Sequence, residues 1–510
     1  MRTLRDYVDK RAAGTPDAPY LIAPETGAVM TYRELQRASR ELSAFLATRG
    51  VRKGDKVALM LHNSYQTARL LIGVMYAGYT VAPLNLLSQR SQLEYVLEHS
   101  DTVLAFTSEE LAPRLREGLG AVSRAVDVVV IDPDATDALR APRECGGARR
   151  AQDMPVLHDV AEDDDALLMY TSGTTGQPKG VLHTHRSVVA GGEYTSSAHR
   201  LARDDRVICA LPLYHINGQI VTGVAPLVHG GSVVMPHRFS VSNYWPLVTA
   251  HRCTWINVVP TIIAYLLNAP DPRAGGLDIS RVKFCRSASA PLPPELHRAF
   301  EEKFGIGIIE TFGMTETNAP CFSNPYDSAK RKLGSPGQAY GNEARIVDLA
   351  SGAPQPPGVP GEIMLRGDNV MKCYYKDPEN SARTLEPDGW LHSGDLGYMD
   401  EDGFVFVTGR MKELIIKGGE NIAPREIDEA LLKHPAVLEA AAVGIPDALY
   451  GQDIMACIVL KPGSCCTIDE LRAFSALELG AYKTPKVLKL VETLPKGPSG
   501  KVQRLKLLEM

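Results

Sequence analysis

The chain has 510 residues, too many for one hydrophobic core, so its length predicts two or more domains. A hydrophobic content of 44% with 23% charged residues is ordinary for a globular enzyme. The 55 Lys and Arg against 60 Asp and Glu give a net charge of −5, which excludes a nucleic-acid binder held by bulk positive charge.

The N-terminus and the cysteines indicate the compartment. The segment Met1–Asp6 lacks an apolar signal core, and the most apolar stretch, Leu70–Leu84, is too short for the ~20 residues of a membrane helix. The nine cysteines are scattered without a Cys-x-x-Cys spacing, and the vicinal pair Cys465–Cys466 has no partner pair. We expect a cytoplasmic protein with reduced thiols and no membrane span.

Helical and strand patterns alternate along the first part of the chain. Thr31 and Glu34 form a capping box that opens a helix with apolar residues at helical spacing. Lys56–Met60 predicts a buried strand, a helix then ends near Gly78, and Thr80–Ala82 begins another strand. This strand–helix–strand order predicts an α/β fold with parallel sheets covered by helices.

The segment from Tyr170 to Gly180 is the most informative part of the sequence. It places five hydroxyl side chains and three glycines around one lysine, Lys179, directly after an apolar run. Glycines let backbone N–H groups approach phosphate oxygens closely, and the lysine adds a point charge. The segment is not an NTPase P-loop. That motif needs Gly-Lys followed by Ser or Thr, whereas here Lys179 is followed by Gly180 and Val181. A different nucleotide chemistry is therefore predicted. The loop residues are Thr171, Ser172, Gly173, Thr174, Thr175 and Gly176.

A composition change near Arg410 predicts a second, smaller domain. Short turn-rich strands precede it, and Gly409–Glu413 is short and charged, as a hinge would be. The expected elements beyond it are a helix from Pro424, strands at Glu439–Gly444 and Ile454–Leu460, a helix from Asp469 and a strand at Val487–Val491. These suffice for one small α+β domain. We therefore expect domains at 1–411 and 412–510.

Besides the phosphate loop, the chain contains seven further short motifs in a characteristic order. They are Leu211–His215, Ser287–Leu292, Glu310–Glu316, Trp390–Asp395, Gly409–Arg410, Lys417–Asn421 and Leu494–Lys501. With these motifs the chain resembles, over essentially its whole length, the adenylate-forming superfamily of acyl-CoA synthetases, carrier-protein adenylation enzymes and luciferases. The resemblance implies a large N-terminal AMP-binding and acyl-binding domain with a small β-barrel-like subdomain. It also implies a small mobile α+β catalytic domain at the C-terminus.

The resemblance implies an AMP-forming carboxylate–CoA ligase that works in two steps. A substrate carboxylate attacks the α-phosphorus of ATP and expels pyrophosphate, and the thiol of coenzyme A then attacks the acyl-adenylate and releases AMP. Because anions repel each other in the first step, catalysis depends on cations and donors placed where negative charge gathers. The implied cofactors are ATP (released as AMP), Mg²⁺ and coenzyme A.

Residue roles in the first step come from the matching positions. The loop Thr171–Lys179 would close over the β- and γ-phosphates, and Thr315 would donate to the α-phosphate. Glu316 would hold Mg²⁺ as a hard oxygen ligand, with Thr171 beside it. Lys501 would bridge the attacking carboxylate and the α-phosphate as an electrostatic clamp, because a carboxylate needs no base near neutral pH.

Other matching positions would contact the nucleotide or coenzyme A. Phe312 would stack under adenine, and Asp395 would accept both ribose hydroxyls with help from Arg410. Lys412 is the implied hinge about which the small domain rotates between the steps, so proline there should block thioester formation selectively. The remaining positions are Ala290, Pro291, Glu310 and Thr311 for the nucleotide, and Gly418, Gly419 and Lys483 for the pantetheine arm and CoA phosphates.

The resemblance also places an acid-binding pocket. Its implied residues are His215, Asn217, Gly218, Val258, Ser287, Ser289, Gly313, Met314 and Asn318. The segment Ser287–Ala290 replaces a Gly-rich stretch common in the family and narrows the wall. Polar groups at Asn217, Gln219, Ser289 and Asn318 would stay unpaired beside a long alkyl chain at a cost of ~1–3 kcal/mol each. We therefore expect a short, medium-chain or aromatic acid with a polar substituent.

Several alternatives remain open on the sequence alone. A stand-alone adenylation enzyme would load the acid onto the phosphopantetheine arm of an acyl carrier protein through the same channel. A catalytically inactive nucleotide-binding scaffold belongs to another class, and a luciferase-type oxidation is more remote. The expected partners are a small carboxylic acid, ATP and coenzyme A, with no nucleic acid; a homodimer is an open expectation.

Overall fold

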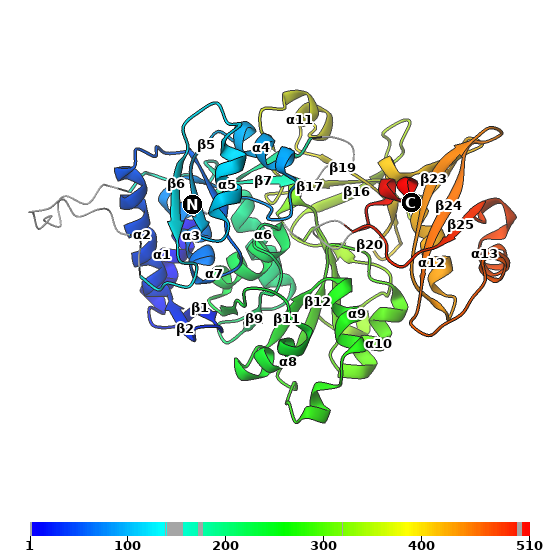
Figure 1. Cartoon of the computed structure of the whole chain (residues 1–510), viewed down its shortest axis with the longest axis horizontal. Coiled ribbons are helices and arrows are strands. Elements are labelled where there is room, and N and C mark those ends of the chain that lie inside the picture. The colour runs from blue at the N-terminus through cyan, green and yellow to red at the C-terminus, as the bar shows by residue number, and fades with distance from the viewer. Residues whose placement is uncertain (1–2, 138, 140–156, 172–176, 319, 497–501) are drawn as a thin grey trace, which may run out of the picture. The chain divides into compact units, whose positions relative to one another are not determined.

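The structure is a computed structural model that describes residues 3–137, 139, 157–171, 177–318, 320–496 and 502–510 (Figure 1). The chain divides into two compact units. Unit 1 contains Met1–Leu333, Ala339–Glu343 and Arg366–Gly389, and unit 2 contains Gly334–Gln338, Ala344–Leu365 and Trp390–Met510.

The first sheet of unit 1, called sheet 1, has a parallel centre. Its strands run in the order β18 (Cys373–Tyr374), β8 (Lys179–Thr184), β7 (Asp165–Thr171), β4 (Thr80–Pro83), β3 (Lys56–Met60), β5 (Thr102–Ser108) and β6 (Asp127–Ile131). From β7 to β6 neighbouring strands pair parallel, whereas β7, β8 and β18 pair antiparallel. The predicted buried strand at Lys56–Met60 is confirmed.

The second sheet, called sheet 2, contributes to unit 1 a run of parallel strands that is flanked on each side by a strand pairing antiparallel. Its order is β14 (Phe322–Ser323), β13 (Ile308–Phe312), β12 (Phe284–Ser287), β11 (Trp255–Val258), β9 (Arg206–Ile208), β10 (Ser232–Val234), β1 (Pro19–Ala23) and β2 (Ala28–Thr31). The strands from β13 to β1 are parallel, so their carboxyl ends share one edge.

Helices cover both sheets of unit 1. They are α1 (Leu4–Gly14), α2 (Tyr32–Thr48), α3 (Tyr65–Ala77), α4 (Arg90–His99), α5 (Ala112–Leu119), α6 (His185–Ala198), η2 (Asn217–Val224), α7 (Ala225–His229), α8 (Val241–Ala250), α9 (Pro260–Asn268), η3 (Pro272–Gly275), α10 (Pro294–Phe304), η4 (Thr315–Thr317), η5 (Ser328–Lys330) and α11 (Pro378–Thr384). Helix α3 contacts strands of both sheets and is buried along its whole length, as expected for a helix between two layers. The predicted capping box of Thr31 and Glu34 opens α2.

The two faces of sheet 2 differ in character. Ile256, Val258, Cys285 and Ile308 belong to a hydrophobic core shared with α8, α9 and α10. Side chains alternate between the faces of a strand, so Asn257 and Arg286 belong to the opposite face. On that opposite face the ring of His199, at the end of α6, stacks on Trp255 and Phe284. The polar residues of sheet 2 thus share the face that carries α6.

Unit 2 is built from antiparallel strands and a small α+β part. The strands are β15 (Gly337–Ala339), β16 (Glu343–Val347), β17 (Gly361–Arg366), β19 (Leu391–Met399), β20 (Phe404–Arg410), β21 (Ile415–Lys417), β22 (Glu420–Ile422), β23 (Val437–Asp447), β24 (Gly451–Leu460) and β25 (Val487–Leu490). The helices are η6 (Met411–Glu413), α12 (Pro424–Leu432), α13 (Ile468–Lys483) and η7 (Arg504–Glu509). Helices α12 and α13 lie beside the β23–β25 strands (Figure 1). The expected α+β elements after residue 412 are confirmed. Within the described ranges, no helix has the length and apolar character needed to cross a membrane.

Candidate active site

The phosphate loop connects the two strands of an antiparallel hairpin. Strand β7 ends at Thr171 and β8 begins at Lys179, and these two residues are register partners. Gly180 is closely packed beside them, because a Cβ there would lie 3.2 Å from side-chain atoms of Leu168 and Tyr170. The predicted loop residues between them, Ser172, Gly173, Thr174, Thr175 and Gly176, lie outside the described residues. The hairpin differs from an NTPase P-loop, where the loop leads from a strand into a helix.

Tyr374 joins two of the predicted phosphate-site residues. It lies on β18, which pairs with β8. The Lys179 ammonium lies 4.5 Å from the centroid of its ring, and its hydroxyl donates to Glu316 Oε1 at 2.9 Å. Burial and the Glu316 charge raise the pKa of Tyr374, so it stays a donor at neutral pH. A cation and a carboxylate are thus held against one tyrosine.

The Glu316 side chain fits a magnesium ligand. Its residue is 9% exposed, and within the described part of the chain its carboxylate forms no ion pair. The described residues contain no cluster of three or more His, Cys, Asp or Glu that could hold a metal alone. Magnesium commonly takes one or two carboxylates and completes its shell with phosphate oxygens and water. Glu316 meets that requirement.

A buried histidine fixes the segment from Thr315 to Asn318. His183 Nε2 donates to the Thr315 carbonyl oxygen at 2.8 Å, and Asn318 Nδ2 donates to His183 Nδ1 at 2.6 Å. Burial lowers the pKa of His183 to about 3, so the ring is neutral and can act as both donor and acceptor. Asn318 adopts a left-handed backbone with φ +49°, a conformation that asparagine tolerates. Thr315 and Asn318 are therefore held by one partner.

Polar side chains gather at the predicted acid-binding wall. Asn217, on the π-helical turn η2, donates through Nδ2 to Ser289 Oγ at 3.0 Å. Its Oδ1 accepts from Arg286 Nη1 at 2.8 Å and from Asn257 Nδ2 at 3.1 Å. Ser289 has φ +73°, a conformation that normally favours glycine. The structure therefore joins Asn217 and Ser289, and it adds Arg286 and Asn257.

The other predicted acid-site and adenine-site residues lie on nearby elements of unit 1. Gly218 is tightly packed, because a Cβ would meet the Pro212 carbonyl oxygen at 2.5 Å. Phe312 is half-buried and its ring centroid lies 5.7 Å from that of Phe322. The remaining positions are fully buried Val258 in the core under α8–α10, buried Ser287, Glu310 and Thr311, half-buried His215, Ala290, Gly313 and Met314, and exposed Pro291.

The predicted ribose-binding residues of unit 2 pair across two strands. Asp395 on β19 and Arg410 on β20 are register partners, and Arg410 Nε donates to Asp395 Oδ1 at 2.9 Å. Asp395 is 3% exposed, and its Oδ2 has no hydrogen-bond partner among the described residues. A buried carboxylate oxygen without a donor is costly. It suits an acceptor for ligand hydroxyls.

The predicted hinge and coenzyme A residues occupy distinct turns of unit 2. Lys412 is exposed on η6, between β20 and β21. Gly418 and Gly419 form the β21–β22 turn with φ +56° and +86°. Lys483 forms an ion pair with Glu426 at 2.6 Å. The predicted clamp residue Lys501 lies outside the described residues.

Comparison with known proteins decides the family. The AMP-binding enzyme family model matches residues 8–375, and the AMP-binding enzyme C-terminal domain model matches residues 426–501. The chain belongs to the AMP-binding enzyme family. A sulfoacetate–CoA ligase from Cupriavidus necator is 53% identical over 99% of this chain and 97% of its own length.

Solved structures of other AMP-binding enzymes agree. ATP-bound MatB from Rhodopseudomonas palustris is 29% identical with a TM-score of 0.89, covering 99% of this chain and 98% of its own. O-succinylbenzoate coenzyme A synthetase from Bacillus subtilis, with ATP and magnesium, is 30% identical with a TM-score of 0.85, covering 98% and 99%. The protein is an AMP-forming carboxylate–CoA ligase, and a carboxylic acid, ATP and coenzyme A are its substrates. The predicted α/β fold class is confirmed.

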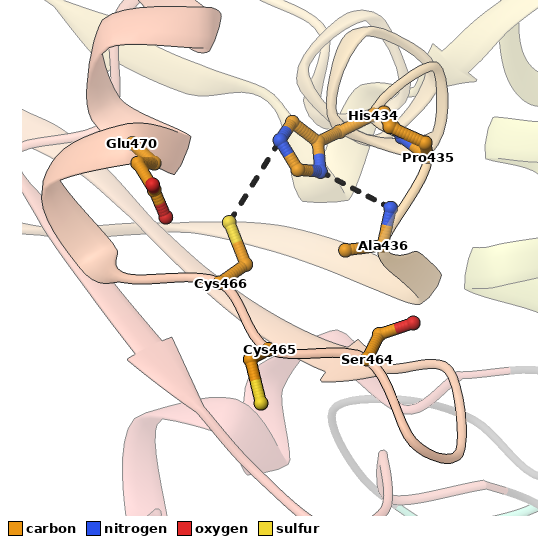
Figure 2. A pocket seen from close by; sticks show the side chains of 7 residues that line it. All are labelled: His434, Pro435, Ala436, Ser464, Cys465, Cys466 and Glu470. Atoms are coloured by element: carbon orange, nitrogen blue, oxygen red, sulfur yellow. Dashed lines mark hydrogen bonds between the residues drawn. The ribbon is translucent and has the colours of Figure 1, made fainter.

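Unit 2 of this AMP-binding enzyme also has an open depression, shown in Figure 2. It is lined by His434, Pro435, Ala436, Ser464, Cys465, Cys466 and Glu470. The groups of this depression have local partners, since His434 Nδ1 accepts from the Ala436 N–H and Glu470 caps α13. Burial raises the pKa of the Cys466 thiol, which argues against a reactive thiolate. Both cysteines are free thiols, as expected.

Sequence reasoning missed Tyr374, Asn257 and Arg286. Tyr374 gives no local signal, because it reaches the phosphate site only through the pairing of β18 with β8. Arg286 had a detectable signal, since a charged residue inside the otherwise buried strand Phe284–Ser287 is unusual. Asn257, its register partner on β11, is a second polar residue in a buried strand.

Proposed function

We propose that this ligase activates a short carboxylic acid with a second polar or acidic group, and that sulfoacetate is the leading candidate. The observation that carries the proposal is the hydrogen-bonded polar group of Asn217, Ser289, Asn257 and Arg286. Its Arg286 Nε–H has no acceptor among the described residues, and a purely alkyl acid would supply none. The relative that is 53% identical over nearly the whole chain is a sulfoacetate–CoA ligase, which supports the same choice.

The first step joins the acid to AMP. The acid carboxylate attacks the α-phosphorus, a P–O bond to pyrophosphate breaks, and the acyl-adenylate forms. Lys179 and the hydroxyls of its loop would hold the outer phosphates, and Thr315 would donate to the α-phosphate. A bound Mg²⁺, held by Glu316 with Thr171 beside it, would neutralise phosphate charge. Lys501 would bring the two reacting anions together.

The second step transfers the acyl group to sulfur. The thiolate of coenzyme A attacks the acyl carbonyl, the C–O bond to AMP breaks, and a thioester forms. Asp395 and Arg410 would hold the ribose. Rotation of the small domain about Lys412 would move Lys501 out of the site and bring in the channel for the CoA thiol, which Gly418 and Gly419 would line. Lys483 would meet CoA phosphates once released from Glu426. Free CoA, rather than a carrier protein, is the expected acceptor.

Acid-dependent ATP–pyrophosphate exchange tests the proposed function. We expect exchange with sulfoacetate to exceed exchange with palmitate and benzoate, and Lys501→Ala to reduce it by at least about 100-fold, since it removes the clamp between two anions. The exposed Lys506→Ala is the matched control for a lost C-terminal charge. Faster exchange with palmitate would refute the substrate class, and full exchange by Lys501→Ala would refute the clamp.

Thioester formation then identifies the acceptor. The products formed from sulfoacetate, ATP and either free CoA or a phosphopantetheinylated carrier protein are separated by mass spectrometry. A CoA thioester as the main product supports the proposal. Acylation of the carrier protein alone would show that the carrier, and not CoA, is the acceptor.

A further inference from the structure

Arg286 is a cation enclosed in unit 1. It lies on β12, is 2% exposed, and donates through Nη1 to Asn217 Oδ1 and Asn257 Oδ1, each at 2.8 Å. Its Nε has no acceptor among the described residues. Both acceptors of the guanidinium are neutral amides, so they orient its charge without balancing it.

Arg286 has no counter-charge beside it among the described residues, because no carboxylate there pairs with it. Burial lowers the pKa of Arg286 to about 9, so the side chain is still cationic at neutral pH. Partly buried Arg504 differs, because it pairs with Asp428 and Glu413. Buried Arg69 also pairs with no carboxylate among the described residues, but it donates to the Asp137 backbone carbonyl and not to side chains of the predicted acid-binding wall. A buried charge without a counter-charge is destabilising, and an incoming anion would relieve that cost.

The position of Arg286 suits contact with a ligand. Parallel strands β11 and β12 end at Val258 and Ser287, one residue beyond Asn257 and Arg286. Ligands of open α/β sheets bind outside the carboxyl ends of their strands. Asn217 contacts both Arg286 and Ser289, so the guanidinium is joined by one amide to the predicted acid-binding wall.

We propose that Arg286, oriented by Asn217 and Asn257, binds the second acidic group of the substrate and so selects short acids that carry two negative groups. This inference rests on the proposed acid activation and specifies its substrate class. One acidic group reacts with ATP, and the other, a sulfonate or carboxylate, supplies the counter-charge that Arg286 lacks. A guanidinium fits either group, because both accept parallel hydrogen bonds.

Two acids of matched shape test the charge preference. Sulfoacetate carries a sulfonate, and methylsulfonylacetate replaces one sulfonate oxygen by a methyl group and loses that charge. We expect the wild-type ratio of kcat/KM, charged over neutral acid, to fall by about 100-fold in Arg286→Met, which keeps the volume without the charge. The measurement is pyrophosphate exchange at saturating ATP, with the KM for ATP as a control.

Asn257→Asp gives an independent second variant. It places a carboxylate where Arg286 Nη1 now donates to an amide oxygen, 2.8 Å away. This internal counter-charge should compete with the second acidic group, so we expect the same ratio to fall at least about tenfold. The substitution also removes the donor to Asn217 Oδ1, so the thermal midpoint is measured beside the ratio to confirm that the variant is folded. Asn268→Asp, on the exposed end of α9, is the matched control for added charge.

The outcomes separate this inference from the proposed function. Equal losses for both acids in Arg286→Met and an unchanged ratio in Asn257→Asp would show a packing role and overturn the proposal. A raised KM for ATP with an unchanged acid ratio would assign the guanidinium to nucleotide phosphate and overturn it as well. Wild-type protein that supports exchange with no acid would instead refute the proposed function.

Discussion

At the scale of single residues, the proposed phosphate site includes one side chain that contacts two others. Tyr374 packs its ring against the Lys179 ammonium and donates its hydroxyl to Glu316. The two interactions use different parts of one side chain, so substitution can separate them. Ligand carboxylates are oriented by hydrogen bonds from neighbours, and loss of such a neighbour commonly costs 10–100-fold in metal affinity or activity, as an order-of-magnitude guide.

Tyr374→Phe should therefore weaken the response to magnesium while preserving the contact with Lys179. We expect the Mg²⁺ concentration for half-maximal pyrophosphate exchange to rise by about tenfold, because Glu316 loses its donor. Tyr375→Phe is the matched control, since the Tyr375 hydroxyl donates to Asp101 instead. Equal shifts in both variants would show that Tyr374 does not orient the metal ligand.

At the scale of an element, the β21–β22 hairpin shows why two adjacent glycines differ. Both have positive φ, as two-residue hairpin turns require. A Cβ at Gly418 would lie 3.1 Å from the Tyr482 hydroxyl and 3.2 Å from Cδ1 of Tyr450, whereas one at Gly419 would have nothing within 4 Å. The Tyr482 hydroxyl donates to the Lys417 carbonyl at 2.6 Å and closes the turn.

Gly418→Ala should slow thioester formation more than adenylation. The added methyl group pushes on Tyr450 and Tyr482, whereas Gly419→Ala meets only the backbone strain of positive φ, about 1 kcal/mol. We expect the thioester rate, relative to pyrophosphate exchange, to fall by about tenfold in Gly418→Ala and by less in Gly419→Ala. Both rates are measured in parallel in each variant. If the ratio of thioester formation to pyrophosphate exchange is the same in Gly418→Ala and Gly419→Ala, the turn does not line the path of the thiol.

At the scale of the whole molecule, buried histidines link stability to pH. Burial lowers the pKa of His183 and His199 to about 3 and that of His185 and His229 to about 4. All four lie in unit 1 and are neutral in the fold. In the unfolded chain each takes a proton near its ordinary pKa of about 6.5.

The protein should lose stability as the pH falls from 7 to 5. Below about pH 6.5 the unfolded chain binds more protons than the fold, so each buried histidine removes up to about 1.4 kcal/mol per pH unit until its folded pKa is reached. The check is the thermal midpoint measured between pH 7 and pH 5. This window lies above the pH range near 4 in which most carboxylates titrate, so histidine protonation dominates the change. A midpoint that stays constant from pH 7 to 5 would contradict protonation of these histidines on unfolding.

The sequence predicted local features better than long-range ones. The capping box of Thr31 and the strand at Lys56–Met60 depend on neighbouring residues, and both are confirmed. The contacts of Tyr374 with Lys179 and Glu316 depend on strand pairing between distant segments, which cannot be predicted from the spacing of neighbouring residues. Arg286 gave a local signal, a charged residue in the buried strand Phe284–Ser287, but its amide partners come from distant segments and could not be predicted from that signal.

The hairpin form of the phosphate loop has a consequence for turnover. A P-loop aims a helix macrodipole, equivalent to about half a positive charge, at the bound phosphates. Here the chain leaves the loop as strand β8, so on our proposal electrostatic retention of the outer phosphates would fall to side chains such as Lys179. The leaving group is pyrophosphate, whose departure drives adenylation forward. Because a strand and not a helix begins at Lys179, this end of the loop adds no helix dipole to the proposed contacts with pyrophosphate, which favours release of that product.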